Sequence, residues 1–319
     1  VQTWHGIPAM APQVAMAWAA QTLRATVVGL SHAAFSKTEY DLGLIGYHGL
    51  DPRPFLRMTR ARTYGCIMRS AYAVTDKQRR SARYIRDYSN LVDAYVCVSR
   101  FVRGAMIQNH PDLADKVTAI YNVIGGPADV ADLKMPQEFL VHKRKLKILT
   151  VCRLEDRAKG LNRMVDACKE LVRICPPFRW FIVGDGPDRG EFVQRIADAG
   201  LGEVFVLCPA TRDPYKFYKY ADLVAVLSYQ EGLCGVVNEA KLLRAPLIAT
   251  RFSAIDEQIK HGENGYIVDN NLQAIITGMT TLLNDEELRR SLAVNGLPAE
   301  LMDTDGKIRR FEGLSQGVL

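Results

Sequence analysis

Two glutamates in the second half of the chain, Glu231 and Glu239, stand where carboxylates could bind a ligand. An apolar run ending at Leu227 predicts a strand, a glycine-containing turn follows it, and Gly235–Leu243 predicts a helix. Unpaired N–H groups at a helix start carry partial positive charge and can hold hydroxyl or phosphate oxygens. Two carboxylates beside them suit a polyhydroxylated ligand, because each accepts hydroxyl protons. Alone, the spacing is more typical of an ordinary strand–turn–helix whose first carboxylate complements the helix dipole.

A second group of charged residues, Arg153 and Lys159, follows another predicted strand. Arg153 comes directly after the strand expected at Lys147–Cys152, and Lys159 with Gly160 opens the helix expected at Leu161–Ile174. Parallel α/β sheets bind ligands at the carboxyl ends of their strands, so both cations are placed to meet one. One arginine and one lysine there predict a diphosphate clamp that needs no metal. Taken alone, they are more typical of a surface charge pair.

Both groups depend on a sheet that brings distant strand ends together, and the chain beyond Lys145 alternates strand and helix patterns. The expected strands are Lys147–Cys152, Arg179–Val183, Glu203–Leu207, Ala221–Leu227, Pro246–Thr250 and Tyr266–Val268. The expected helices are Leu161–Ile174, Asp188–Ala199, Pro214–Tyr220, Gly235–Leu243, Ala254–His261 and Leu272–Leu283. Continuous apolar strands with helices between them predict an α/β fold with a doubly wound parallel sheet, covered on both faces.

The first part of the chain is less regular. Pro12–Gly29 has a long helical pattern, and further helices are expected between Pro52 and Tyr88. A helix at Arg100–Asn109 is expected between strands at Ala94–Val98 and Val117–Tyr121. This pattern contains only about three strands, few for a free-standing sheet. The N-terminal domain is therefore expected to be incomplete and to lack its first strands.

Glycine and proline mark the predicted domain boundaries. Gly125-Gly126-Pro127 and Pro136 punctuate a segment that is expected to connect two domains. We therefore expect an N-terminal domain over residues 1–138 and a C-terminal domain over residues 139–296. The remaining tail, residues 297–319, is expected to pack back on the N-terminal domain.

Composition and charge bound the class of protein. The 319 residues are 48% hydrophobic and 24% charged with a net charge of +6, which is typical of a soluble chain long enough for two domains. No apolar run approaches the roughly eighteen residues that cross a bilayer. Seven cysteines without a C-x-x-C pair predict reduced thiols in a cytoplasmic protein and no zinc site. Asp303-Thr304-Asp305 follows no predicted strand, so no metal role is expected for it.

A basic region from Arg53 to Arg86 concentrates arginine and lysine beside few acidic residues. One interpretation is a solvated helical face. The other is a surface attracted to anionic lipid headgroups or to a phosphorylated acceptor, which would place the protein at the inner face of a membrane. No recognition motif or aromatic interleaving supports a nucleic-acid partner.

The motifs of the second half resemble those of glycosyltransferase family 4, whose members have the GT-B fold, two Rossmann-like domains facing a cleft. The resemblance runs from about Lys145 to Asp285. In order, its motifs are Arg153-Leu154, Lys159-Gly160, Val183-Gly184-Asp185-Gly186-Pro187, Tyr220-Ala221-Asp222, Ser228 through Glu239-Ala240, and Asn264-Gly265-Tyr266. Val96-Cys97-Val98-Ser99 and Tyr121-Asn122 extend the resemblance more weakly into the first domain.

The resemblance implies a retaining transfer of a sugar from a nucleotide-diphosphate donor to an acceptor hydroxyl, without a metal or another cofactor. The acceptor would be a glycan or a lipid-linked molecule, as in cell-surface polysaccharide or glycolipid synthesis. Arg153 and Lys159 would hold the donor diphosphate, and Glu239 would bind the ribose hydroxyls. Glu231 would bind the hydroxyls of the transferred sugar and is the expected catalytic carboxylate.

The same resemblance assigns a binding role to the backbone N–H groups of Leu233, Cys234 and Gly235. This sequence departs from the family there, because relatives often have glycine at the position of Cys234 and a larger apolar residue at that of Gly235. Backbone contacts could survive the exchange, but it leaves the preferred donor sugar open.

The motif Thr3-Trp4-His5-Gly6 places a histidine at the mouth of the first domain, where family members often have one that touches the donor sugar. His5 is therefore a second catalytic candidate, with a structural histidine at a strand end as the alternative. The same four residues resemble a motif of CDP-glycerol glycerophosphotransferases, so an enzyme of that kind stays a second hypothesis. An inactive partner subunit that only binds nucleotide is a third, which the intact set of charged site residues disfavours.

Overall fold

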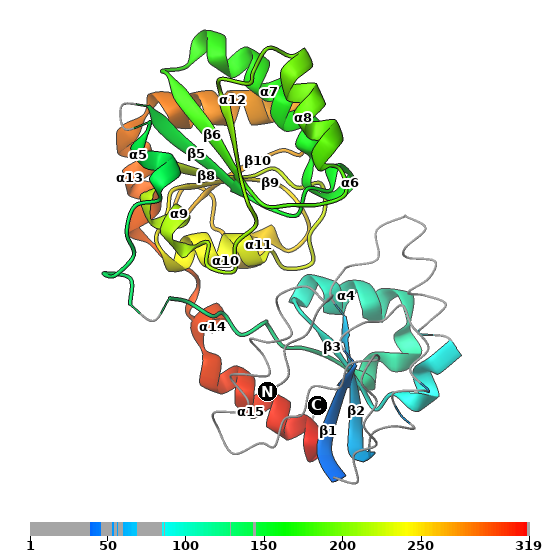
Figure 1. Ribbon diagram of the computed structural model, residues 1–319. Helices are drawn as coiled ribbons and strands as arrows, with labels where there is room; N and C mark the ends of the chain where they lie inside the picture. Colours follow the sequence, from blue (N-terminus) through cyan, green and yellow to red (C-terminus); the bar gives the residue numbers. More distant parts are fainter. Residues whose placement is uncertain are drawn as a thin grey trace. The chain divides into compact units, whose positions relative to one another are not determined.

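The computed structural model describes residues 39–45, 53, 56, 60–68, 85, 87–127, 129–142 and 145–317. The chain divides into two compact units, Val1–Val123 with Glu300–Leu319, and Ile124–Ala299 (Figure 1). The helical pattern at Pro12–Gly29 and the motif around His5 lie outside the described residues.

The second unit is built on a parallel sheet with the strand order β10-β9-β8-β5-β6-β7. Its strands are β5 (Leu146–Val151), β6 (Phe178–Val183), β7 (Phe205–Cys208), β8 (Leu223–Val226), β9 (Leu247–Thr250) and β10 (Tyr266–Val268). Each overlaps a strand expected from an apolar run, and the doubly wound parallel sheet predicted from the sequence is confirmed.

Helices cover both faces of this sheet. They are α5 (Gln137–Leu140), α6 (Asp156–Lys159), α7 (Leu161–Ile174), α8 (Arg189–Asp198), α9 (Tyr215–Tyr220), α10 (Gly235–Leu242), α11 (Ile255–Gln258), α12 (Leu272–Asn284) and α13 (Glu286–Val294). In Figure 1, α7, α8 and α12 lie on one side of the strands and α9, α10 and α11 on the other.

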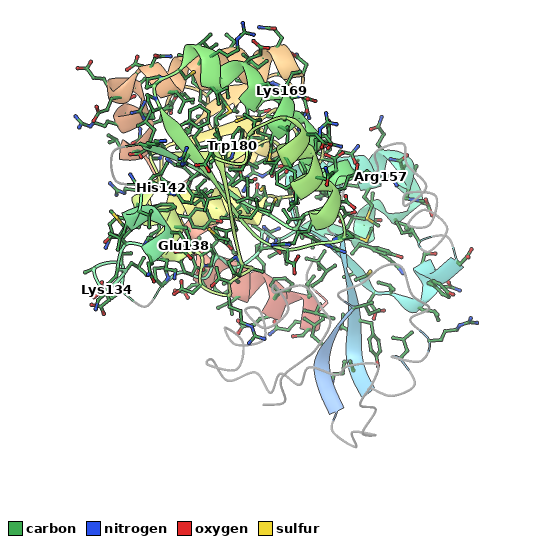
Figure 2. All side chains as sticks on the ribbon, turned by 45° about the horizontal axis from the view of Figure 1, so that its top comes forward. Lys134, Glu138, His142, Arg157, Lys169 and Trp180 are labelled. Carbon is green, nitrogen blue, oxygen red and sulfur yellow. The ribbon has the colours of Figure 1, made fainter. Side chains whose placement is uncertain are left out.

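Alternate residues of the central strands pack into two separate hydrophobic cores, because successive side chains of a strand point to opposite faces of the sheet. Ile148 of β5 and Trp180 of β6 pack with α7, α8 and α12, whereas Leu149 and Phe181 pack with α9, α10 and α11. Trp180 is fully buried inside the second unit (Figure 2). Burial on both faces explains why these strands read as continuous apolar runs.

The strand order reverses between β5 and β8. The chain proceeds from β5 outward through β6 to β7, and then returns to pair β8 with the other edge of β5 before continuing outward to β9 and β10. A parallel sheet opens a ligand site at the carboxyl ends of the two strands where the order reverses. In this unit those ends are Val151 and Val226, which precede the two groups of charged residues.

The first unit contains a smaller parallel sheet in the order β1-β2-β3-β4. Its strands are β1 (Glu39–Ile45), β2 (Arg60–Met68), β3 (Ala94–Cys97) and β4 (Val117–Ala119). The prediction of helices between Pro52 and Tyr88 is therefore wrong over β2. Arginines at its start resemble a charged helical face, but Cys66 and Met68 at its end are buried as core residues.

Helices pack on this sheet from the middle and the end of the chain. Helix α4 (Arg100–Asn109) follows β3, and its start is capped by the Ser99 side chain, which accepts from the Val102 amide at 3.2 Å. After α14 (Ala299–Met302), helix α15 (Thr304–Ser315) places Phe311 and Leu314 against Ala94 and Val96 of β3. The side chain of Asp303, within the Asp-x-Asp sequence, caps the start of α15.

The compact units divide at Val123, before the boundary expected at residue 138. The connecting segment is tied to the second unit instead. The Tyr215 hydroxyl donates to the carbonyl of Gly125 at 2.9 Å, and Lys219 Nζ donates to the carbonyl of Val130 at 2.6 Å. All seven cysteines are free thiols. Among the described residues, no helix has the length and hydropathy needed to cross a membrane.

Candidate functional site

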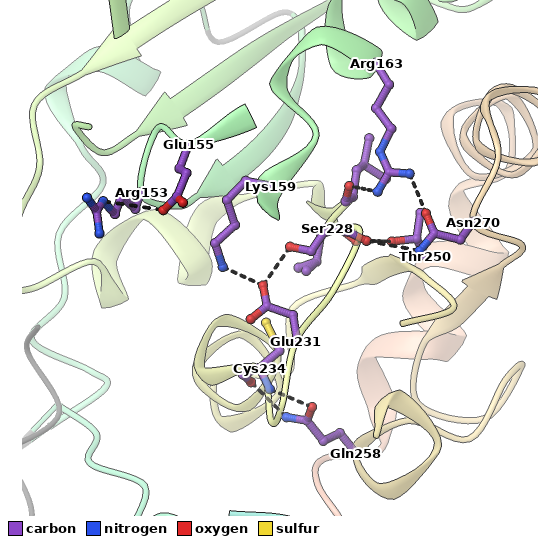
Figure 3. Close-up of polar contacts among 12 residues, drawn as sticks. Arg153, Glu155, Lys159, Arg163, Ser228, Glu231, Cys234, Thr250, Gln258 and Asn270 are labelled. Atoms are coloured by element: carbon purple, nitrogen blue, oxygen red, sulfur yellow. Dashed lines mark hydrogen bonds and ion pairs between the residues drawn. The ribbon is translucent and has the colours of Figure 1, made fainter. Parts of the chain in front are cut away.

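The centre of the candidate site is an ion pair between the two loops that leave β5 and β8. Lys159 Nζ lies 2.5 Å from Glu231 Oε1, and the Ser228 hydroxyl donates to the same oxygen at 2.7 Å (Figure 3). The side chains of Lys159 and Glu231 are 22% and 15% exposed, so a ligand can still reach them. Two residues predicted from separate motifs are thus brought into contact where the strand order reverses.

Lys159 keeps its positive charge in this environment. Burial acts to lower its pKa, but the attraction and hydrogen bond of Glu231 outweigh burial and raise the pKa above its ordinary value. The Cys152 and Cys234 thiols border the same pair, and burial raises the pKa of each to about 12. Both cysteines are therefore neutral, and the charge of the site comes from the lysine and the glutamate.

The turn that carries Glu231 is held in place from several directions. The Tyr229 amide donates to the Ala158 carbonyl at 2.9 Å, which joins this turn to the loop that follows β5. Thr250, at the end of β9, donates its hydroxyl to the Ser228 carbonyl at 2.6 Å. The Asn270 side chain donates to the Tyr229 carbonyl at 3.1 Å. A carboxylate on a turn with this many anchors keeps a defined position.

Arg163 of α7 is the most extensively bonded of these anchors. It is 6% exposed and donates to Asn270 Oδ1 (Figure 3) and to the carbonyl of Leu227. Its guanidinium stacks 3.8 Å from the Tyr229 ring centroid. Burial lowers its pKa, yet a guanidinium stays charged at neutral pH. The planar fork fixes the end of β8 and the following turn at once.

Gly160 is required where the two loops meet. Its φ of +68° lies in the left-handed region, and a Cβ there would approach the Leu227 carbonyl oxygen to 2.7 Å. It would also lie 2.4 Å from Arg163 Nε. The glycine of the Lys159-Gly160 motif therefore lets α7 start close enough to β8 for the lysine to reach Glu231.

If Glu231 is the catalytic carboxylate that the sequence predicts, Arg163→Met should lower sugar transfer by about tenfold or more, because a catalytic group misplaced by a fraction of an ångström loses rate steeply. The turn would lose the guanidinium hydrogen bonds to Leu227 and Asn270, while methionine keeps the apolar volume of the side chain on α7. Steady-state kinetics should show a larger fall in kcat than rise in donor KM.

Arg173→Met, on the same helix with a side chain 73% exposed, is the matched control. Equal kinetics for the two variants, or a loss of Arg163→Met that simply follows a fall in melting temperature, would contradict the positioning role.

Glu239 lies in α10 and is bound on one side by the protein. Its Oε2 accepts a hydrogen bond from the Tyr218 hydroxyl of α9 at 2.9 Å. Burial raises the pKa of Glu239, while this hydrogen bond acts to lower it. Burial also raises the pKa of Tyr218 well above its ordinary value, so the tyrosine stays protonated and donates. The second carboxylate oxygen remains for hydroxyl donors of a ligand.

Tyr218→Phe is expected to weaken nucleotide binding by about two- to tenfold, the range for an ordinary hydrogen bond, because the lost bond orients Glu239 and does not itself contact the nucleotide. Without the hydroxyl, the pKa of Glu239 rises further, so its charge disappears at a higher pH. The acid limb of kcat/KM against pH should therefore move to higher pH.

Tyr220→Phe, on the same helix as Tyr218, is the control. It removes a hydroxyl that donates to the Leu133 carbonyl. Coincident pH profiles for wild type and Tyr218→Phe would contradict the assignment.

The start of α10 differs from the expectation in one respect. The Cys234 amide donates to Gln258 Oε1 at 3.1 Å, and Gln258 Nε2 returns a bond to the Cys234 carbonyl at 2.8 Å (Figure 3). The Cys234 amide is therefore engaged by the protein and cannot also serve a ligand in this state. At Gly235, a Cβ would meet nothing within 4 Å, so this helix start borders open space.

Arg153 is the most accessible of the charged site residues that the structure describes. Its side chain is 65% exposed and lies 3.8 Å from Glu155 in a loose ion pair. The nearby turn at Val183–Pro187 has a packing role, because a Cβ on Gly184 would lie 1.8 Å from the Cys152 carbonyl oxygen. The glycine therefore lets this turn pack directly against the loop that carries Arg153.

Two further expectations concern His5 and a metal ion. His5 lies outside the described residues, so its catalytic role stays a prediction. Within the described residues, no group of three or more His, Cys, Asp or Glu side chains is arranged to hold a metal ion.

Several residues that shape the site were missed by sequence reasoning: Tyr218, Gln258, Arg163, Asn270 and Thr250. The available signal was a polar residue in apolar surroundings. Arg163 interrupts the apolar stripe of α7. Gln258 is fully buried but follows Asp256 and Glu257, so the sequence gives no such signal for it. Buried polar groups are nearly always hydrogen-bonded, but sequence does not say to what.

Comparison with known proteins identifies the family. A model described as "Glycosyl transferases group 1" matches residues 132–297, more than half of the 319-residue chain. An uncharacterized glycosyltransferase of Methanocaldococcus jannaschii is 24% identical over 217 residues, covering 67% of this chain and 56% of that protein. The capsular polysaccharide biosynthesis glycosyltransferase CapM of Staphylococcus aureus is 33% identical over 144 residues, covering 43% of this chain and 37% of CapM. The chain thus spans less than two thirds of these relatives.

Solved structures share the fold. TarM of S. aureus, solved with fondaparinux, alpha-GlcNAc-glycerol and UDP, matches with a TM-score of 0.68 and 16% identity over 86% of this chain and 55% of its own. HepE of Anabaena, solved with UDP and glucose, matches with a TM-score of 0.66 and 21% identity over 81% of this chain and 72% of its own. The chain has two parallel α/β sheets of the GT-B fold, and it belongs to the glycosyl transferases group 1 family, as its motifs predicted.

Proposed function

We propose that this chain carries the donor side of a retaining glycosyltransferase that moves a sugar from a nucleotide diphosphate to an acceptor hydroxyl. The contact between Lys159 and Glu231, where the strand order of the second sheet reverses, is the observation that carries the proposal. It joins a cation suited to a diphosphate with a carboxylate suited to sugar hydroxyls. Family membership supports sugar transfer over the glycerophosphotransferase alternative.

The donor is proposed to be a UDP-sugar. HepE and TarM, which share the fold, were each solved with UDP. Glu239, with one oxygen bound by Tyr218, would accept hydroxyl protons from the ribose on its other oxygen. Arg153, exposed and only loosely paired with Glu155, would turn toward the diphosphate together with Lys159.

Electrostatic stabilisation is the proposed source of catalysis. When the glycosidic bond to the diphosphate breaks, negative charge builds on the leaving group, and Arg153 and Lys159 would stabilise it from fixed positions. Lys159 would exchange its bond to Glu231 for one to phosphate, which frees that carboxylate for the sugar. The acceptor hydroxyl would attack from the leaving-group face and give its proton to the departing phosphate, so no separate protein base is needed.

The acceptor is proposed to be a glycan or a lipid-linked molecule in cell-surface polysaccharide or glycolipid synthesis. CapM is a capsular polysaccharide biosynthesis enzyme, and a further relative of Erwinia amylovora acts in amylovoran biosynthesis. Relatives often have glycine at the position of Cys234 and a larger apolar residue at that of Gly235. Because this chain differs there, the family does not indicate which sugar it transfers.

A thermal-shift screen against UDP-, GDP-, ADP- and CDP-sugars tests the donor proposal directly. A ligand at a hundred times its Kd stabilises the folded state by about 2.7 kcal/mol, so a true donor should raise the melting temperature clearly. UDP-sugars are expected to shift it most. A larger shift with another base would overturn the UDP assignment, and no shift with any member would overturn the donor site.

A further inference from the structure

The first compact unit contains a polar cavity that none of the proposed donor-site residues lines. It has a volume of ≈ 520 Å³ and lies along β4, the last strand of the described sheet. Its lining residues from α4, from the 3₁₀ turn at Pro111–Lys116 and from β4 include Arg100, Arg103, Asp115 and Thr118. Tyr121, Glu300 and Arg310 complete its charged and polar wall.

Two arginines are fixed over neighbouring residues of β4. Arg103 Nε donates to the Val117 carbonyl at 3.1 Å, and Arg310 Nη2 donates to the Thr118 hydroxyl at 3.2 Å. Val117 and Thr118 are adjacent, so helices from distant parts of the sequence bring their guanidinium groups to the same short stretch of strand. A tethered guanidinium loses less side-chain entropy when it binds an anion.

Most hydrogen-bond donors of this pair remain available for a ligand. A guanidinium has five N–H donors, and each arginine spends one on β4. Among the described residues, neither Arg103 nor Arg310 forms an ion pair, although Asp115 also lines the cavity. Arg100 is different, because its guanidinium pairs with Glu300. The three arginines and two acids leave the lining with an excess of positive charge.

The geometry fits an oxyanion better than an apolar or cationic group. Guanidinium forks match the oxygen spacing of phosphate and bind it through parallel hydrogen bonds. Thr118 and Tyr121, 8% and 4% exposed, give the cavity a buried polar part. The volume exceeds that of a bare phosphate and accommodates the group that bears it.

We propose that Arg103 and Arg310 form a phosphate-binding site in the first unit, for a phosphate carried by a soluble ester or by a lipid headgroup. This site is distinct from the proposed diphosphate clamp, since Arg153 and Lys159 belong to the other compact unit. It would hold the phosphate of a molecule other than the sugar donor, and it does not depend on sugar transfer.

The test compares Arg103→Gln/Arg310→Gln with Arg173→Gln/Arg309→Gln in the full chain. The second pair removes the same charge from exposed positions that do not line the cavity. The probes are glycerol 3-phosphate, measured by calorimetry, and vesicles of phosphatidylcholine with or without phosphatidylglycerol, measured by sedimentation. UDP is present throughout, so that the donor site is occupied.

The cavity variant is expected to lose about tenfold or more in affinity for at least one probe, since two charge-assisted hydrogen bonds are lost. The control should stay within about twofold. Loss with glycerol 3-phosphate assigns a soluble phosphate ester, and loss with the anionic vesicles alone assigns a lipid headgroup. Equal binding by the two variants, or no binding of either probe by the wild type, overturns the proposal.

Folding is controlled separately. Arg310→Gln alone removes one exposed side chain of α15 and leaves Arg103 and its contact to β4 in place. It should weaken the same probe as the double variant with an unchanged melting temperature. A single variant that binds like the wild type while the double variant has a lower melting temperature would show a structural effect and overturn the site.

Discussion

Glu231→Ala is expected to reduce sugar transfer severely while the chain stays folded. Its carboxylate is the acceptor for both Lys159 and Ser228, where the segments that follow β5 and β8 meet. If it binds the sugar as it passes through the transition state, turnover should fall by about a hundred- to a thousandfold, as when an active-site group that stabilises developing charge is removed. Initial rates with saturating donor measure this loss.

Nucleotide binding separates this role from a structural one. Without Glu231, Lys159 loses its partner and is free to meet phosphate, so UDP affinity should be unchanged or higher. Glu191→Ala, on the exposed side of α8, removes the same charge elsewhere in the second unit and should leave turnover intact. Near-normal turnover of Glu231→Ala, or parallel losses of turnover, UDP binding and melting temperature, would refute the assigned role.

Lys159→Ala is expected to weaken binding of UDP by about ten- to a hundredfold, the range for one hydrogen bond between charged groups. Because the pKa of Lys159 is raised, its charge is present throughout the neutral pH range, and the loss should be the same across it. Calorimetry with UDP and with uridine gives a sharper answer than UDP alone. Uridine has no phosphate, so its affinity should be nearly equal in wild type and variant.

Lys169→Ala provides the matched control, because it lies on the adjacent helix α7 and pairs with nearby Asp166 in an exposed ion pair. Such surface pairs contribute little. Unchanged UDP affinity of Lys159→Ala would contradict the diphosphate clamp. An equal loss with uridine would show that the lysine supports the fold of the loop and does not bind phosphate.

Much of the second unit could be predicted because its information is local. Each strand is a short, continuous apolar run between helical segments, as expected for a strand of a parallel sheet that is buried on both faces. The rule that parallel sheets bind ligands at carboxyl strand ends then placed Arg153, Lys159, Glu231 and Glu239 without knowledge of the contacts. The first unit was harder, because the arginines at the start of β2 resemble a charged helical face and hide its buried end.

The sequence by itself therefore determined the fold class, the family and the four charged residues in the segments that follow β5 and β8. Only the tertiary structure decided that β8 pairs with β5, which brings Lys159 to Glu231, that Arg163 and Tyr218 support the two carboxylate positions, and that Gln258 occupies the Cys234 amide. It also decided that Arg103 and Arg310 meet over β4. The physical reason is that periodicity reports which face of an element is buried, whereas strand order and the partners of buried polar groups depend on packing between segments far apart in the chain.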